Sequence, residues 1–295
     1  MTNIFTSQAW VESQCGLRSR PLALQEIDPG FYVKESRLGA LKRWTVYGNT
    51  DEQQNTTLNK LASLGSKAGV YDISCNFNMS RWHVEEIPNN YDVKTSFGTF
   101  LVACKPLEEL LPKCSKGHKS DIKKSIKLNQ YIEFTDDLEI CSDLIISSYD
   151  RSLKKTPVNY TYLKNLRDAL GEKVLFYRCC NSLGETQAVA VIIKDSDRAY
   201  YLHGGRKVDA TTGSVHHLIL GIAEDLGTNK VKYFDLGGVS RESENAKARG
   251  IYRFKKGFGG DYVPCVYWQL ILKPILGQLV QVAEWGRRTF SSNFQ

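Results

Sequence analysis

Residues 113–127 form the most charge-biased stretch of the chain and are the first candidates for chemistry. They read KCSKGHKSDIKKSIK, with six lysines and one aspartate. If the stretch is helical, four lysines fall along one side: Lys116, Lys119, Lys123 and Lys127. Ile122 and Ile126 then point the other way. Because like charges repel one another, a bound anion would stabilise the lysine side. The stretch predicts a contact with a polyanion, either an RNA backbone or a phosphorylated substrate; the alternative is an ordinary solvated helix face.

A second basic stretch, residues 247–256, contains no acidic residue. Its cations are Lys247, Arg249, Arg253, Lys255 and Lys256. Beside an RNA, such side chains contact phosphates, which positions the RNA without reading its sequence. The whole chain carries 39 basic and 32 acidic residues, a net charge of +7. Because this surplus is modest, the location of the charge is more informative than its sum.

Three short motifs follow one another between residues 199 and 260. The first is AYYLHGG, with Tyr200, Tyr201 and His203. After a predicted helix over 214–226 comes KYFDLGGV, in which Leu-Gly-Gly follows Asp235. The third is GIYRFKKGFGG, with Tyr252, Phe254, Lys255 and Phe258. In this order the motifs resemble those of the FemABX family, the tRNA-dependent aminoacyltransferases of the GNAT superfamily that build peptidoglycan cross-bridges.

The first basic stretch adds a second block to this resemblance. Residues 118–125, HKSDIKKS, are similar to the H-[RK]-x-x-I-[RK]-[RK]-[AS] helix that opens the family's second lobe. The two blocks cover about half of the chain in the family's order. The resemblance implies an α/β fold with mixed (α+β) sheets, built from two GNAT-like acyltransferase lobes. The expected boundaries are 1–112 for the first lobe, 113–270 for the second, and 271–295 for a C-terminal helix that returns to the first lobe.

The resemblance also implies an activity, the transfer of an aminoacyl group from aminoacyl-tRNA to an amine of a peptidoglycan precursor or another peptide or amino-sugar acceptor. An aminoacyl-tRNA is already an activated ester, so no protein nucleophile is required. The catalytic residues carried over are Lys255, Phe254 and Asp235. Lys255 would stabilise the oxyanion of the tetrahedral intermediate, an interaction worth about 2.7–4 kcal/mol. Phe254 would contact the substrate. Asp235 would either accept a hydrogen bond from the incoming ammonium or only cap the Gly-Gly turn.

Substrate and tRNA contacts follow from the same resemblance. The predicted substrate-binding residues are His203, Tyr201, Tyr252, Lys164 and Arg167. His203 replaces a family tyrosine of the acceptor cleft and is either a general base or structural, while Lys164 and Arg167 flank the position of a phosphate-binding arginine. The predicted tRNA-binding residues are Lys116, Lys119, Lys123, Lys124, Lys127, Arg249, Arg253 and Lys256. IFTSQAW resembles the family's N-terminus, where some members place a lysine just after the tryptophan to hold the phosphates of a nucleotide-linked precursor. No lysine follows Trp10, so it stays open whether the acceptor is nucleotide-linked.

The loop between Gly205 and Ser214 bears on the donor. Acyl-CoA enzymes of the superfamily place Q/R-x-x-G-x-G/A there, so that backbone amides at a helix N-terminus hold the pyrophosphate. This loop reads GRKVDATTGSV and lacks the paired glycines. The sequence therefore favours aminoacyl-tRNA as the donor and predicts no cofactor. The alternatives are a GNAT N-acyltransferase that uses acyl-CoA on a nucleotide-sugar or amino-acid derivative, and an RNA-binding or scaffold protein that has lost the reaction.

Hydrophobic periodicity places the elements that must position these motifs. In the first lobe it predicts strands over 20–25, 30–34, 42–47, 70–75 and 97–104. In the second lobe it predicts strands over 131–135, 173–180, 188–194, 198–204, 230–236 and 262–268. Helices are expected over 138–149, 163–170, 214–226 and 274–288. Periodicity alone supports an α/β class.

Composition excludes several other classes. Apolar residues make up 42% and charged residues 24%, ordinary globular values that exclude a disordered chain or a coiled coil. No apolar run reaches the roughly 18–20 residues of a membrane span, and the first residues lack a secretion signal, so a cytoplasmic protein is expected. The eight cysteines include no CxxC pair and no zinc spacing. Neither a metal site nor a DNA partner is predicted.

Overall fold

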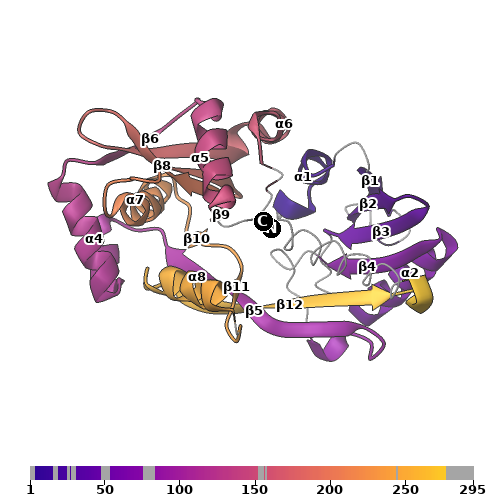
Figure 1. Cartoon of the computed structure of the whole chain (residues 1–295). Helices are drawn as coiled ribbons and strands as arrows, with labels where there is room; N and C mark the ends of the chain where they lie inside the picture. Colours follow the sequence, from indigo (N-terminus) through magenta and orange to yellow (C-terminus); the bar gives the residue numbers. More distant parts are fainter. Residues whose placement is uncertain are drawn as a thin grey trace, which may run out of the picture. The chain divides into compact units, whose positions relative to one another are not determined.

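The computed structural model describes residues 4–15, 19–24, 27, 31–47, 54–75, 84–151, 156, 158–243 and 245–276. The chain divides into two compact units. Unit 1 comprises Met1–Ile4 and Ser96–Pro264, and unit 2 comprises Phe5–Thr95 and Cys265–Gln295. Each unit is a mixed α/β structure (Figure 1). In the described ranges, no helix combines the length and apolar character that a membrane crossing requires.

Unit 2 is built on a small mixed sheet. Its elements are the 3-10 helices η1 (Ile4–Thr6) and η2 (Val84–Glu86), the helices α1 (Gln8–Ser13) and α2 (Gln54–Lys67), and the strands β1 (Ser19–Ala23), β2 (Tyr32–Leu38), β3 (Leu41–Val46) and β4 (Val70–Cys75). The second half of β12 (Asp261–Ile271) completes the sheet in the order β1-β2-β3-β4-β12. Only β3 and β4 pair in parallel among these described strands. Trp44, Trp268 and Leu61 lie in the core, which joins α2 to this sheet.

Unit 1 carries all three motifs. Its helices are α3 (Leu107–Leu110), α4 (Lys116–Lys127), α5 (Leu138–Asp150), α6 (Tyr160–Leu170), α7 (Ser214–Thr228) and α8 (Ala246–Lys256), with the short 3-10 helices η3 (Leu111–Lys113) and η4 (Gly171–Lys173). Its strands are β5 (Asp92–Ala103), β6 (Tyr131–Phe134), β7 (Val174–Cys180), β8 (Thr186–Lys194), β9 (Arg198–Arg206), β10 (Tyr233–Asp235) and β11 (Val239–Ser240).

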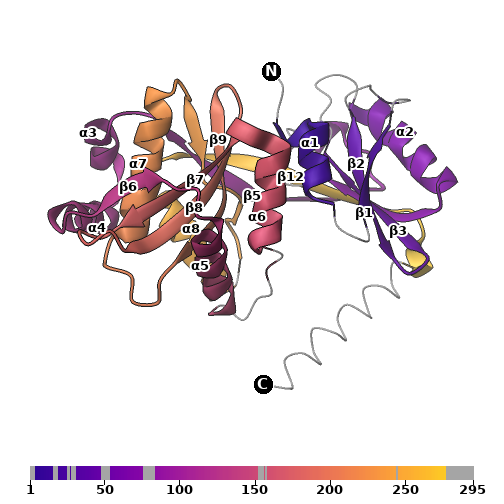
Figure 2. The same ribbon diagram turned by 90° about the horizontal axis from the view of Figure 1, so that it is seen from above.

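The sheet of unit 1 places β9 and β10 at its centre. The strand order is β5-β10-β9-β8-β7-β6, with β11 also paired to β5. β9 and β10 pair in parallel, whereas the other pairs are antiparallel. Helix α7 packs on one face of the sheet, and α5 and α6 pack on the other (Figure 2). Eight of the nine residues of β8 are buried, as expected for a strand that is covered on both faces.

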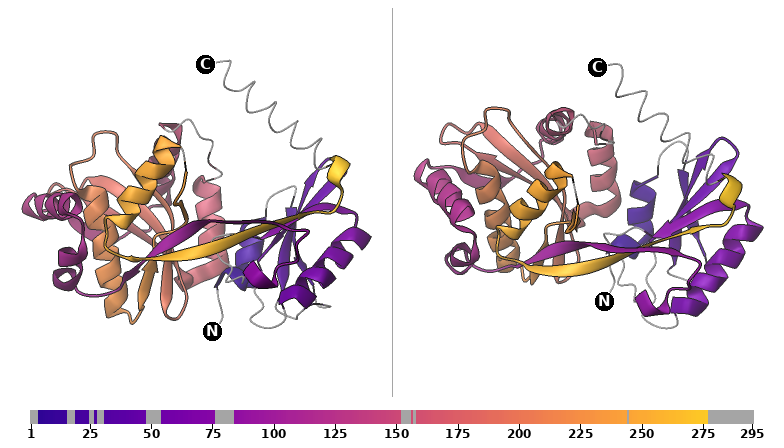
Figure 3. Two further views of the ribbon diagram at one scale, coloured as in Figure 1. Left: turned by 90° about the horizontal axis from the view of Figure 1, so that it is seen from below. Right: turned by 60° about the horizontal axis from the view of Figure 1, so that its bottom comes forward.

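The boundary between the units lies earlier than the sequence suggested. The prediction divides the lobes at residue 113, whereas residues 96–112 belong to unit 1. The physical reason is β5, whose second half pairs with β10 and β11. β5 and β12, the two longest of the described strands, each carry the chain from one unit into the other (Figure 3). Of the predicted C-terminal helix over 271–295, residues 277–295 lie outside the described part of the chain.

Candidate active site

The Asp-Leu-Gly-Gly motif forms a turn where two parallel strands stop pairing. The register of β9 and β10 ends at the pair Tyr200 and Asp235. The chain then turns through Gly237, whose φ of 79° is left-handed, and joins β11. Asp235 is buried, and its Oδ1 accepts hydrogen bonds from the Gly237 N–H (2.8 Å) and the Thr99 hydroxyl. Asp235 therefore caps the turn, which was one of its two predicted roles.

Lys255 is held against this turn by two hydrogen bonds. Its Nζ donates to the carbonyl oxygens of Gly237 (3.0 Å) and Gly238 (3.2 Å). The side chain is half-buried. Burial lowers the pKa of Lys255 to about 8, and the charge of Asp235 acts in the opposite direction. An ammonium has three donors, and among the described residues the third N–H of Lys255 finds no acceptor, so one donor is left for a substrate.

The same turn favours glycine at position 237 and surrounds the Asp235 carboxyl with groups that shift its pKa. At Gly237 a Cβ would lie 3.3 Å from the Tyr201 carbonyl oxygen and 3.4 Å from Lys255 Nζ, in a backbone conformation that favours glycine. Burial raises the pKa of Asp235, whereas the hydrogen bonds from Thr99 and Gly237 and the charge of Lys255 lower it. Thr99 is a site residue that sequence reasoning missed. Nothing distinguishes it in the strand sequence GTFLVAC.

Lys255 lies on a helix, whereas periodicity predicts no helix in this region. Asn245 caps α8, because its side chain accepts from the N–H groups of Lys247 and Ala248. At the other end of α8, the Gly257 carbonyl accepts from the Ser115 N–H (2.8 Å). His118 Nε2 donates to the Phe254 carbonyl at 2.8 Å. Helix α4 therefore fixes the end of α8 that carries Lys255.

The Phe254 ring has different neighbours from the Lys255 side chain, and its contact with the substrate stays a prediction. It packs against the rings of His118, His216 and Phe258, with centroids 5.4, 5.2 and 5.2 Å away. Successive residues of a helix point about 100° apart, so Phe254 and Lys255 face different neighbours. Burial lowers the pKa of both His118 and His216. The Phe254 backbone, through its bond to His118, is the part that positions Lys255.

A β-bulge separates the two predicted cleft residues of β9. Tyr201 lies opposite Ile192 and His203 lies opposite Val191, so Leu202 is an extra residue. Tyr201 consequently packs with the core cluster on the α7 face, 6.5 Å from the Phe234 ring. His203 reaches the other face and contacts the Tyr162 hydroxyl of α6 at 3.2 Å. Strict alternation would have placed Tyr201 and His203 on one face.

His203 is neutral in this environment. Burial lowers its pKa to about 4. Its buried Nδ1 has no hydrogen-bond partner among the described residues. A neutral imidazole with an unused nitrogen retains the capacity to bond a substrate group, which keeps the predicted role of His203 open.

The other predicted substrate-binding residues lie on two helices, Tyr252 on α8 three residues before Lys255, and Lys164 and Arg167 on α6. The Tyr252 ring packs against Phe100, with centroids 5.3 Å apart, and against Tyr262, 6.2 Å away. Lys164 is exposed on α6 and pairs with Asp168 of the same helix at 2.5 Å. Arg167, three residues further along α6, is half-buried.

The predicted tRNA-binding residues lie on two helices, α4 and α8. Those exposed are Lys116, Lys123, Lys124, Lys127, Arg249, Arg253 and Lys256. Lys119 is half-buried and donates to the Pro112 carbonyl at 3.2 Å. In the described part of the chain, none of the five α4 lysines forms an ion pair. Ile122 is fully buried as expected, but Ile126 is 41% exposed, because Ser125 occupies the buried position and bonds His217 at 3.0 Å.

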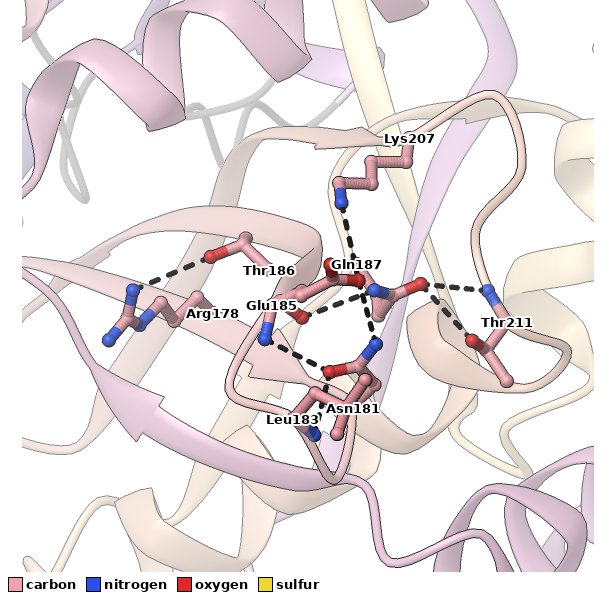
Figure 4. Close-up of polar contacts among 8 residues, drawn as sticks. All are labelled: Arg178, Asn181, Leu183, Glu185, Thr186, Gln187, Lys207 and Thr211. Carbon is pink, nitrogen blue, oxygen red and sulfur yellow. Dashed lines mark hydrogen bonds and ion pairs between the residues drawn. The ribbon is translucent and has the colours of Figure 1, made fainter.

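The loop before α7 is tied down by the side chain of Gln187 (Figure 4). Gln187 is buried on β8, and its Oε1 accepts from the N–H (3.0 Å) and hydroxyl (3.1 Å) of Thr211. Its backbone carbonyl accepts from the Lys207 N–H at 2.9 Å. The Thr211 amide is thereby used within the protein rather than left for a ligand.

Helix α4 covers the beginning of α7. Gly213, with φ of 86°, precedes the helix, and a Cβ there would overlap the backbone carbonyl of Asp121. The carboxylate of Asp121 lies 3.6 Å from Nδ1 of His216, in the first turn of α7. Protein groups of α4 thus occupy the space next to this helix N-terminus.

Comparison with known proteins identifies the fold. No protein-family model matches the chain, and no curated protein matches its sequence. A crystal structure of FemX is similar with a TM-score of 0.69 and 14% identity, over 92% of this chain and 93% of FemX. The C-terminal domain of a putative lysylphosphatidylglycerol synthetase from Agrobacterium fabrum has a TM-score of 0.64 and 12% identity, over 91% of this chain and 88% of that domain. A conserved protein of unknown function from Bacteroides thetaiotaomicron gives 0.64 and 13%, over 91% of each chain.

These similarities confirm the predicted fold class. The chain has a FemABX-like fold of the GNAT type, with mixed α/β lobes. At identities of 12–14% the likeness concerns the fold, so function must be inferred from the residues of the site.

Proposed function

We propose that the protein is an aminoacyltransferase that forms an amide between an aminoacyl group carried by tRNA and an amine acceptor. The observation that carries the proposal is Lys255, a partly buried ammonium fixed on the Asp-Leu-Gly-Gly turn where β9 and β10 stop pairing. Such a fixed cation has one donor to offer to a developing oxyanion. The FemABX-like fold supports the same reaction class.

In the proposed reaction the neutral amine of the acceptor attacks the ester carbonyl of the aminoacyl-tRNA. A C–N bond forms and the C–O bond to the tRNA ribose breaks. The proton leaves the amine for the ribose oxygen, relayed by the ribose hydroxyl beside it. Lys255 donates to the oxyanion of the intermediate. Asp235 acts as a positioning residue, because it fixes the turn and its charge favours the ammonium form of Lys255.

The geometry around α7 supports tRNA over acyl-CoA as the donor. An acyl-CoA enzyme needs free backbone amides before and within the first turn of this helix. Here Gln187 takes the Thr211 amide, and Asp121 packs at Gly213 and His216. A pyrophosphate in that space would meet a carbonyl oxygen and a carboxylate, both of which repel it. The alternative is the acyl-CoA N-acyltransferase, which a transfer assay distinguishes.

The tRNA surface proposed here lies where α4 and α8 meet. The hydrogen bonds from Ser115 to Gly257 and from His118 to Phe254 join the first turn of α4 to the last turn of α8. Four cations border this junction: Lys116, Lys119, Arg253 and Lys256. Arg253 and Lys256 lie on the α8 turn that carries Lys255, and Lys116 and Lys119 lie on the α4 turn bonded to it. Phosphates bound there would bring the aminoacyl end of the tRNA toward Lys255.

A transfer assay tests the proposal. The protein is incubated with tRNA charged with radiolabelled amino acids and with a panel of amines that includes peptidoglycan precursors, peptides and amino sugars. Amide-linked label from the tRNA, absent with Lys255→Met, is the expected result. Acylation of the same amines from acetyl-CoA, without any transfer from tRNA, would contradict it and establish the alternative.

A further inference from the structure

Exposed apolar side chains gather at one edge of unit 1, next to lysines that the junction of α4 and α8 does not use. Ile126 is 41% exposed and Leu128 is 43% exposed, both at the C-terminal end of α4. Tyr131, which begins β6, is 42% exposed. Leu183, in the turn between β7 and β8, is 82% exposed. Single exposed apolar residues are ordinary on protein surfaces, but four within one edge require an explanation.

Tyr131 and the turn that carries Leu183 are neighbours in space, and Ile126 and Leu128 precede Tyr131 closely in the chain. Ile126, Leu128 and Tyr131 follow one another closely along the end of α4 and the start of β6. Tyr131 pairs with Cys180 on β7, and its hydroxyl lies 3.8 Å from the position of a Cβ at Gly184. The tip of the β7–β8 turn therefore lies beside the Tyr131 side chain. We name Ile126, Leu128, Tyr131 and Leu183 the apolar edge.

The turn that presents Leu183 is internally braced. Asn181 Oδ1 accepts from the N–H groups of Leu183 (3.0 Å) and Glu185 (2.9 Å), and Asn181 Nδ2 donates to the Glu185 carboxylate at 3.0 Å (Figure 4). Glu185 also lies 3.8 Å from Lys207. Leu183 is thus held at the tip by its neighbours, and inserting it into an apolar phase requires little further ordering.

The charge around the apolar edge is positive. Lys123, Lys124 and Lys127 are exposed on the last two turns of α4 and form no ion pair within the described residues. The nearby carboxylates are already engaged, since Glu133 pairs with Arg178 at 2.6 Å and Glu185 bonds Asn181. Projecting apolar side chains beside unpaired lysines form a surface complementary to an anionic lipid bilayer.

We propose that the apolar edge and its three lysines dock on the surface of an anionic membrane, with Leu128 and Leu183 inserted among the lipids and the lysines on headgroup phosphates. RNA would use the lysines but would gain nothing from exposed leucines, because contacts to its backbone are polar. Lys127 lies eleven residues beyond Lys116, about 16 Å along the helix at 1.5 Å per residue. The membrane surface therefore begins at Lys123, one helical turn beyond Lys119 of the proposed tRNA surface, and extends to the opposite end of α4 from Lys116.

Co-sedimentation of the full chain with vesicles tests this proposal without any substrate. Vesicles of phosphatidylcholine alone are compared with vesicles that also contain phosphatidylglycerol. Binding to the anionic vesicles only is expected. The triple variant Lys123→Gln, Lys124→Gln, Lys127→Gln should bind roughly 100-fold more weakly, since each lysine near such a surface contributes about 1 kcal/mol. The variant Leu128→Ser, Leu183→Ser should bind at least about tenfold more weakly.

Matched controls separate the apolar edge from net charge and general apolar exposure. Lys173, Lys230 and Lys232 are exposed lysines elsewhere on unit 1, and their triple glutamine variant should bind as the wild type does. Val208→Ser, at a side chain that is 70% exposed, should also be neutral. Equal losses in test and control variants, or no binding of the wild type to anionic vesicles, would overturn the proposal. A triple lysine variant that loses tRNA binding but keeps vesicle binding would assign these lysines to RNA instead. Because vesicle binding requires no catalysis, the result is independent of the proposed transfer reaction.

Discussion

Replacement of Lys255 by methionine separates its proposed catalytic role from its structural one. Methionine keeps the length and burial of the side chain but removes the donors to Gly237 and Gly238. The Thr99 hydroxyl lies 3.1 Å from the Gly237 carbonyl oxygen, but its one proton is donated to Asp235. Both carbonyls therefore lose the Lys255 donor. Because Gly237 and Gly238 are half-buried, water replaces part of these bonds, and the expected loss of unfolding free energy is about 1–3 kcal/mol.

The catalytic effect should be larger than the structural one. Loss of one oxyanion donor raises the barrier by about 2.7–4 kcal/mol, a decrease of roughly 100- to 1,000-fold in kcat. Single-turnover transfer from labelled aminoacyl-tRNA measures this step, and urea unfolding measures stability in parallel. Lys256→Met, one residue further and exposed, is the matched control and should retain the wild-type rate. Lys255→Met activity within threefold of wild type, with intact folding, would refute the oxyanion role.

Three further predictions concern pH, packing and donor binding. Burial lowers the pKa of Lys255 to about 8, so its ammonium is lost as the pH rises through that value. The variant Lys255→Arg stays charged, so the ratio of wild-type turnover to its turnover should fall above about pH 8. A constant ratio would show that the charge is not used. A Cβ at Gly257 would overlap the His118 ring, so Gly257→Ala should lower the unfolding free energy by about 1–3 kcal/mol, and thermal unfolding equal to that of wild type would contradict this packing. The double variant Arg253→Gln, Lys256→Gln should show a weaker salt dependence of tRNA binding. The slope of log affinity against log salt should decrease by about 0.9 for each phosphate that is no longer neutralised. An unchanged slope in filter binding would show that α8 is not part of the tRNA surface.

The fold could be predicted from the sequence because its signals are distributed along the chain. The motif order from Tyr200 to Phe258 and the helix over 118–125 indicated a FemABX-like fold, which the structural similarity confirms. Long buried strands such as β8 have a pattern that periodicity detects. The boundary between the units was wrong because β5 is continuous, so neither a break nor a change in composition marks residue 96.

The details of the site depended on features that no periodicity reveals. The bulge at Leu202 reverses the facing of Tyr201 and His203, and a bulge requires the partner strand to be known. Helix α8 was not predicted, although Asn245 is a recognisable N-cap residue. The bond from the Thr99 hydroxyl to Asp235 joins residues 136 positions apart, so only the folded sheet brings them together.

The central claim, that this fold uses aminoacyl-tRNA as its donor, is tested most directly by a binding comparison. Bulk aminoacyl-tRNA is titrated in a filter-binding assay at two salt concentrations, and acetyl-CoA is titrated by calorimetry under the same conditions. We expect tRNA binding that weakens at the higher salt concentration, and no heat of binding from acetyl-CoA. Tight binding of acetyl-CoA without binding of tRNA would contradict the claim and identify the protein as an acyl-CoA enzyme.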